Sequence, residues 1–177
     1  MLAARIQEHG GDAVEETLAA RTARLERAQK FNREKEAFAR SYDGVNASRA
    51  AHQRLVDDLK ASSDMLSSVG CRVQDVPYGG IVMLVGTGVV LAVQYDCVYA
   101  NSLDKAVLIA KFYDGVPKLP GLIVMHDPGT LKTWRFTFQL VGPGRSAWVG
   151  LDQKEHPPEA LAEFLLKHFL ELQQQRL

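Results

Sequence analysis

Two small groups of residues have the types that acid–base catalysis needs, a histidine beside carboxylates. His126 and Asp127 end an apolar stretch, and His156 follows Asp152 and Glu155. An imidazole exchanges protons near neutral pH, and a neighbouring carboxylate can orient it. However, Asp127 is followed by Pro-Gly, which is typical of a turn, and His156 is followed by prolines suited to the start of a helix. We interpret both groups as polar residues of a turn and of a helix start, and we keep His126 with Asp127 as an alternative site.

Metal and phosphate sites have no supporting spacing in this sequence. The five histidines include no pair four residues apart, and the two cysteines, Cys71 and Cys97, lie far from each other. A structural zinc site needs four ligands at characteristic spacing. Gly86-Thr87-Gly88 lacks the third glycine of a dinucleotide-binding loop and leads into a strand-like stretch. We expect no metal and no cofactor, and an enzymatic role is the less favoured hypothesis.

Composition and charge also narrow the class of protein. Hydrophobic residues make up 46% of the 177 residues and charged residues 24%, as in an ordinary soluble protein, and the formal net charge is zero. A nucleic-acid-binding protein usually carries a basic excess, so nucleic acid is not a favoured partner. The longest apolar runs are far shorter than the roughly 20 residues of a membrane-spanning helix. We expect a soluble, intracellular protein without membrane contact, cytoplasmic or nuclear.

The first part of the chain predicts helices. Residues 13–42 are rich in Ala, Arg, Glu and Lys without glycine or proline, and Asp12 is suited to cap their start. Asp43-Gly44 interrupts this pattern, after which Asn46 can cap a second helix over 47–69. One helix kinked at Gly44 is the alternative. The predicted domains are a helical arm, 1–69, and a sheet domain, 70–177.

Apolar spacing in this arm favours pairing with another helix. Steps of three and four residues recur in the second helix, as in a coiled-coil seam. In the first helix, the pair Leu18 and Leu25 and the pair Phe31 and Phe38 are each one heptad apart but stand in different registers. This break is compatible with a helical hairpin or with a short coiled coil that contains a stutter. The predicted oligomerisation seam consists of Leu18, Leu25, Phe38, Leu55, Leu59 and Leu66.

The second part predicts an antiparallel meander of about six strands. Short turns rich in glycine, asparagine and aspartate separate the valine-rich stretches, so neighbouring strands should run antiparallel. Residues 131–151 form the clearest hairpin, folded around Gly142-Pro143-Gly144-Arg145. The stretches before it are a short lead-in at 72–76 and strands at 81–85, 89–99, 105–113 and 122–126.

The hairpin has two different faces because its side chains alternate. The aromatic face is predicted to be core, covered by a C-terminal helix over 157–175 that has a broad apolar stripe. The polar face, Thr133, Arg135, Thr137 and Gln139, is the surface we predict for a protein partner.

These observations predict an α+β fold with a long, coiled-coil-like helical arm, an antiparallel meander and a closing helix. In its order of elements the chain resembles small adaptor subunits such as the RWD-like modules of kinetochore coiled coils, and this resemblance implies a role in assembly. We hypothesise a non-enzymatic adaptor that forms a homo-oligomer or binds a protein partner through its arm. The alternative hypothesis is a ligand-binding or enzymatic site between the sheet and the C-terminal helix, with His126, Asp127 and Arg135 as its polar groups.

Overall fold

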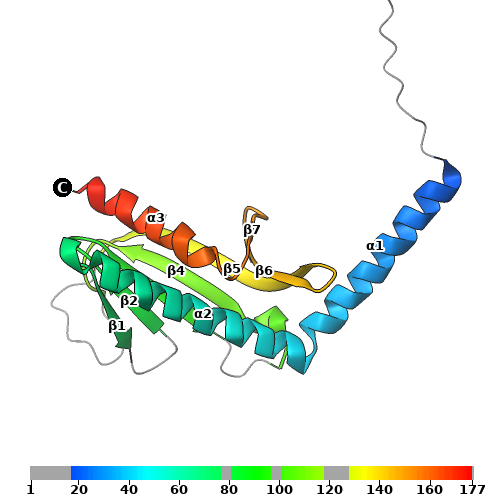
Figure 1. Ribbon diagram of the computed structural model, residues 1–177, viewed down its shortest axis with the longest axis horizontal. Helices are drawn as coiled ribbons and strands as arrows, with labels where there is room; N and C mark the ends of the chain where they lie inside the picture. Colours follow the sequence, from blue (N-terminus) through cyan, green and yellow to red (C-terminus); the bar gives the residue numbers. More distant parts are fainter. Residues whose placement is uncertain (1–16, 77–80, 97–100, 118–127, 177) are drawn as a thin grey trace, which may run out of the picture.

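The computed structural model describes residues 17–76, 81–96, 101–117 and 128–176. It confirms an α+β fold with an antiparallel sheet and a C-terminal helix (Figure 1). The predicted cap Asp12, Cys97 and the predicted strand 122–126 lie outside the described residues. The helices are α1 (Leu18–Ala39), α2 (Tyr42–Leu66) and α3 (Leu161–Gln174), with short 3-10 turns η1 (Ser67–Val69) and η2 (Leu103–Lys105). The strands are β1 (Arg72–Val76), β2 (Ile81–Val85), β3 (Val90–Asp96), β4 (Val107–Tyr113), β5 (Thr130–Gly142), β6 (Arg145–Gly150) and β7 (Glu155–His156).

The seven strands lie in the sheet in the same order as in the sequence. Every neighbouring pair is antiparallel, which agrees with the predicted antiparallel meander. The hairpin of β5 and β6 is present, and Gly144 adopts a φ of 64° at its turn. The short strand β7 was not predicted, because two residues give no periodic signal.

Two helices cover the same face of this sheet (Figure 1). Leu55 and Leu59 of α2 pack into one core with Leu165 and Phe169 of α3 and with inward-facing side chains of the strands. The aromatic face of the hairpin also belongs to this core, and Trp148 is completely buried. Burying each such side chain contributes about 1.5–3 kcal/mol, so the core formed by α2, α3 and the sheet dominates stability.

The predicted coiled-coil-like arm is not confirmed. Leu55 and Leu59, two residues of the predicted seam, are 0% and 1% exposed within the core of a single chain, and Leu66 is half-buried against it. Apolar residues at steps of three and four suit a helix that packs on a sheet as well as one in a coiled coil. Here α2 packs on the sheet, because the apolar face of the sheet must be covered. Among the described helices, α1 is the one that extends away from the body (Figure 1).

A tight corner separates α1 from α2. The Ser41 hydroxyl donates to the Phe38 carbonyl at the end of α1 and accepts from the Gly44 backbone N–H at the start of α2. Gly44 lies against the same carbonyl, and a side-chain carbon there would overlap it. The second helix therefore starts at Tyr42 and includes Gly44, instead of starting after Asn46 as predicted. The chain forms two helices at this corner, α1 and α2, instead of one kinked helix.

Candidate functional site

The helix α1 lies against the body through its C-terminal half. Phe31 and Phe38 are half-buried on the side facing the hairpin, whereas Leu18 and Leu25 are 81% and 56% exposed. At about 100° per residue, Leu18 and Phe38 lie on nearly opposite sides of the helix, so the three predicted seam residues of α1 do not form one stripe. None of the 22 residues of α1, all of which the structure describes, is fully buried.

A turn before β4 fixes the C-terminal end of α1. The Ser102 hydroxyl donates to the Ala39 carbonyl at 3.2 Å and accepts from the Asp104 backbone N–H at 3.3 Å, and the same hydroxyl proton is shared with the Asp104 carboxylate at 3.0 Å. The first bond satisfies a carbonyl that the end of the helix leaves free. The second starts η2 and holds Asp104 beside the end of α1. This arrangement places one strand connection, one helix end and the hairpin around a common hollow.

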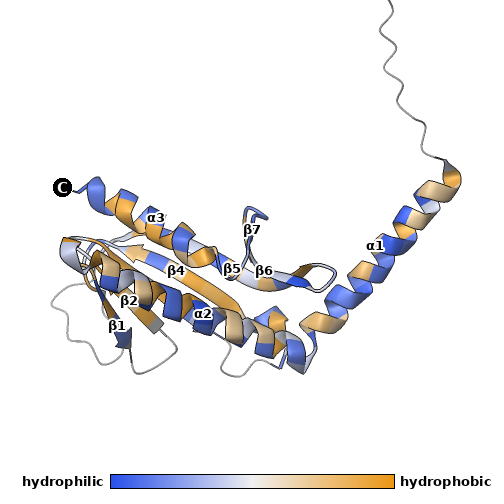
Figure 2. Cartoon of the chain, in the orientation of Figure 1, coloured by the Kyte–Doolittle hydropathy of each residue, from blue (hydrophilic) through white to orange (hydrophobic). Residues whose placement is uncertain are grey.

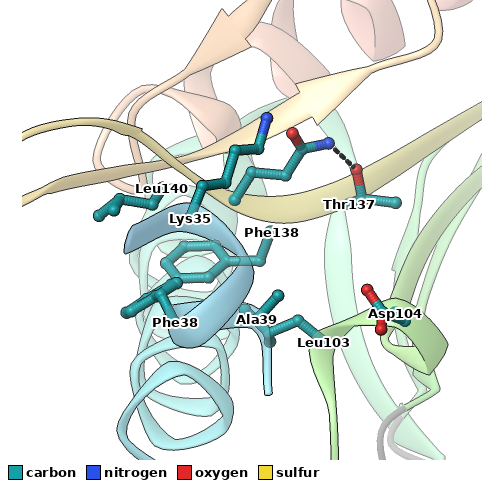
Figure 3. A pocket seen from close by; sticks show the side chains of 9 residues that line it. Lys35, Phe38, Ala39, Leu103, Asp104, Thr137, Phe138 and Leu140 are labelled. Carbon is teal, nitrogen blue, oxygen red and sulfur yellow. Dashed lines mark hydrogen bonds between the residues drawn. The ribbon is translucent and has the colours of Figure 1, made fainter. Parts of the chain in front are cut away.

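That hollow has a volume of about 370 Å³ and lies between α1 and β5 (Figure 3). Its apolar lining comes from α1, from η2 and from β5, and includes Phe38, Leu103, Phe138 and Leu140. The polar lining consists of Lys35, Asp104, Thr137 and Gln139. An apolar surface with a few polar groups of both charges is typical of a recognition site.

The polar groups of this hollow suit hydrogen bonding better than catalysis. Gln139 donates through Nε2 to the Thr137 hydroxyl at 2.7 Å, which orients its amide oxygen away from that bond as an acceptor. Lys35 offers a cation and Asp104 an anion at the same hollow. No nucleophile stands beside a base among these lining residues. The arrangement can read a polypeptide backbone or polar side chains.

Two further hollows lie along α1 next to the first one. One of about 510 Å³ lies between the middle of α1 and the tip of the hairpin and is lined by Arg27, Lys30, Phe31, Val141 and Pro143 among others. The other, of about 350 Å³, lies beside the end of α1 and shares Lys35, Ala39 and Asp104 with the first. We call the three together the α1–hairpin groove.

The predicted partner face divides into two parts. Thr137 and Gln139 are half-buried and line the groove, whereas Thr133 and Arg135 are exposed on the same side of β5. Sequence analysis missed Lys35, Asp104 and the hairpin tip as parts of a site. The heptad spacing of Phe31 and Phe38 was the one signal that could have identified the side of α1 that faces the body, but nothing in the sequence says which strand it meets.

The alternative site receives no support from the described residues. His126 and Asp127 lie outside them. Between the sheet and α3 the space is filled by Leu161, Leu165 and Phe169, which are 0% exposed. A hollow of about 600 Å³ that involves α3 lies instead between α2 and α3.

The second acid–base group is held by structural contacts. The His156 ring packs against Phe164 and Phe136, and this burial lowers its pKa. The charge of Asp152 has a smaller raising effect on this pKa, and the charge of Lys154 a smaller lowering effect. A backbone hydrogen bond from Lys154 lowers the pKa of Asp152. Glu155 pairs with Arg145 at 3.4 Å. Each member therefore has a local partner, as expected for the loop interpretation.

The described residues contain neither a metal-binding cluster nor a membrane-spanning helix. No group of three or more histidine, cysteine, aspartate or glutamate side chains in them is placed to hold a metal ion. None of the described helices combines the length and the apolar character needed to cross a bilayer. No known protein family matches the chain, and comparisons with characterised proteins and with solved structures gave no match.

Proposed function

We propose that the protein is a non-enzymatic interaction protein that binds a partner along α1 and the adjoining side of β5. The observation that carries this proposal is that α1 extends from the body without a fully buried residue. Helices in proteins owe most of their stability to the packing of one face against the rest of the molecule. A partner would supply the packing that the body does not.

The surface chemistry of α1 supports a polar interface. Figure 2 shows hydrophilic residues interrupting the hydrophobic ones along the whole of α1, in contrast to the apolar strand β4. Interfaces that form and separate are commonly mixed in this way, with a few apolar anchors among polar groups. Leu18, Leu25, Phe31 and the exposed pair Thr133 and Arg135 are available as such anchors and rim residues.

A site-specific cross-linking experiment tests this proposal. A photo-activated cross-linking side chain at position 25, on the outward side of α1, should capture a second chain in the cells that make the protein. The same side chain at position 151, where Leu151 is 81% exposed in the turn after β6, is the matched control. Cross-links at position 25 but not at 151 support a partner surface on α1, and mass spectrometry then distinguishes another copy from a different protein.

Light scattering provides the second measurement. If the partner is another copy, the full chain has the mass of an oligomer, and removal of residues 1–40 returns it to a monomer. The truncated chain is expected to stay folded because α2, α3 and the sheet form the core. A full chain that is monomeric and gives no cross-link at position 25 would contradict the proposal.

A further inference from the structure

The hollow between the middle of α1 and the tip of the hairpin combines apolar and basic groups. Phe31 of α1 faces Val141 and Pro143 of the hairpin, and Arg27, Lys30 and Glu34 contribute the charges. The half-buried Phe31 leaves part of its ring open to this space. A volume of about 510 Å³ is large enough for one bulky apolar side chain and its neighbours.

The charges around this hollow are available for a partner. Arg27 donates through Nε to the Ala23 carbonyl at 3.2 Å, and no hydrogen bond in the described part of the chain uses its two terminal nitrogens. Lys30 lies 4.0 Å from Glu34, and their side chains are 80% and 47% exposed. Such a surface pair contributes little to stability, so Lys30 can exchange its partner at small cost.

The charges of α1 indicate the charge that a partner should carry. Between Leu18 and Lys30, basic residues recur at every third position from Arg21, and Glu26 is the one acidic residue. A second α1 would bring like charges together, which disfavours direct pairing of two such helices. A nucleic acid would need a continuous basic stripe, but steps of three residues turn these side chains around the helix, and Glu34 stands at the same rim.

We propose that this hollow binds an acidic segment of a partner protein that carries a bulky apolar anchor. The anchor occupies the space against Phe31, Val141 and Pro143, while carboxylates beside it meet Arg27 and Lys30. Such charge-assisted contacts at the rim of an apolar contact provide specificity and a fast association rate. This inference rests on the proposed function and adds the chemistry of the partner.

The experiment is a selection from a library of random peptides of about a dozen residues, displayed singly and presented to the immobilised full chain. We expect the enriched peptides to contain several aspartates or glutamates beside a leucine, phenylalanine or tryptophan. The best of them is then synthesised and titrated against the full chain in solution. A matched peptide with asparagine and glutamine in place of its acids should bind at least about tenfold more weakly, a loss of about 1.4 kcal/mol.

Variants of the protein locate the site. The double variant Arg27→Glu, Lys30→Glu and the single variant Phe31→Ala should each weaken binding of the acidic peptide about tenfold or more. The control is Arg72→Glu, Lys167→Glu, which changes the net charge equally at two exposed positions on β1 and α3 and should leave affinity within about twofold. Circular dichroism and the melting temperature verify that all variants are folded.

Three outcomes would overturn this inference. Enriched peptides without an acidic excess would show that charge does not select the partner. Equal weakening by the control variant would show an effect of net charge and not of this hollow. A single-stranded RNA oligonucleotide that binds more tightly than any selected peptide, with the same dependence on Arg27 and Lys30, would identify a nucleic-acid site. Cross-linking at position 25 is independent of all three, so the proposed function can stand when this inference fails.

Discussion

At the scale of single residues, His52 is the group whose burial has a consequence for pH. Its ring stacks on Tyr95 at a centroid distance of 4.7 Å, and burial lowers its pKa below the ordinary 6.5. The folded state therefore favours the neutral ring, while the unfolded state takes up a proton near pH 6.5. The stability that depends on neutral His52 is complete above that pH and is lost as the pH falls from there toward the lower pKa of the folded state.

We expect His52→Phe to reduce this pH dependence. The phenyl ring keeps the stacking on Tyr95 but does not take up a proton. Urea unfolding at about pH 7.5 and about pH 5.5 should show a smaller loss of stability for the variant than for the wild type. The pKa of His156 is lowered in the same direction, but His156 is present in both proteins, so the difference reports on His52. Identical losses would show that His52 does not titrate between these conditions.

A buried hydrogen bond holds the ring of Tyr95, on which His52 stacks, through its hydroxyl group. The hydroxyls of Ser48 and Tyr95 lie 2.5 Å apart, and Ser48 also donates to the Val45 carbonyl. In Tyr95→Phe, Ser48 keeps its backbone partner but loses the second one. We expect a loss of about 1 kcal/mol in the free energy of unfolding, measured in urea. Ser48→Ala and the double variant complete a cycle, and additive losses would show that the two hydroxyls are not coupled.

At the scale of elements, the loss of a leucine should lower the free energy of unfolding much more in α2 than in α1. Leu55 is fully buried in α2, so Leu55→Ala should lower the free energy of unfolding by about 2–5 kcal/mol. Leu25 is exposed on α1, so Leu25→Ala should change it by less than about 0.5 kcal/mol. Chemical denaturation of both variants tests the division between a core helix and a projecting one. Similar losses at both positions would contradict it.

The corner between the two helices reverses an ordinary helix preference. Replacing glycine by alanine inside a helix usually stabilises by about 1 kcal/mol. At Gly44 the added carbon would overlap the Phe38 carbonyl, so Gly44→Ala should destabilise by more than about 1 kcal/mol. Asn46→Ala, two residues further along on the exposed side of α2, is the matched control and should be neutral or slightly stabilising. A stabilised Gly44→Ala in thermal unfolding would show that the corner is not this tight.

At the scale of the whole molecule, local patterns predicted elements better than contacts between them. The alternation in Trp134, Phe136 and Phe138 predicted a strand with one buried face, and the turn at Gly142–Arg145 predicted its hairpin. The spacing of Leu55 and Leu59 identified an apolar helix face correctly but not what covers it, because a coiled coil and a sheet require the same spacing. The partner of a helix face is a property of the tertiary arrangement.

The candidate site shows the same limit. Its polar residues on β5, Thr137 and Gln139, follow from strand alternation and were predicted. Lys35 and Asp104 join them because α1 and the turn before β4 both lie against β5, and Ser102 connects that turn to the end of α1. That bond connects segments far apart in the sequence, and no local propensity or period encodes it. The groove could therefore be predicted from one side only.

Hydrogen exchange of the whole chain tests how far α1 depends on a partner. The amides of α1 before Arg27 precede the part of the helix that lies against the hairpin, so they should exchange almost as fast as unfolded ones, while those near Phe38 should be moderately protected. The amides of β3 and β4, at the centre of the sheet, should exchange most slowly, since their exposure requires global unfolding. Addition of a binding partner should slow exchange in the first half of α1 and leave β3 unchanged.

Slow exchange throughout α1 in the dilute protein alone would mean that the helix is already covered. A faster rate on further dilution would then identify another copy of the chain as the cover.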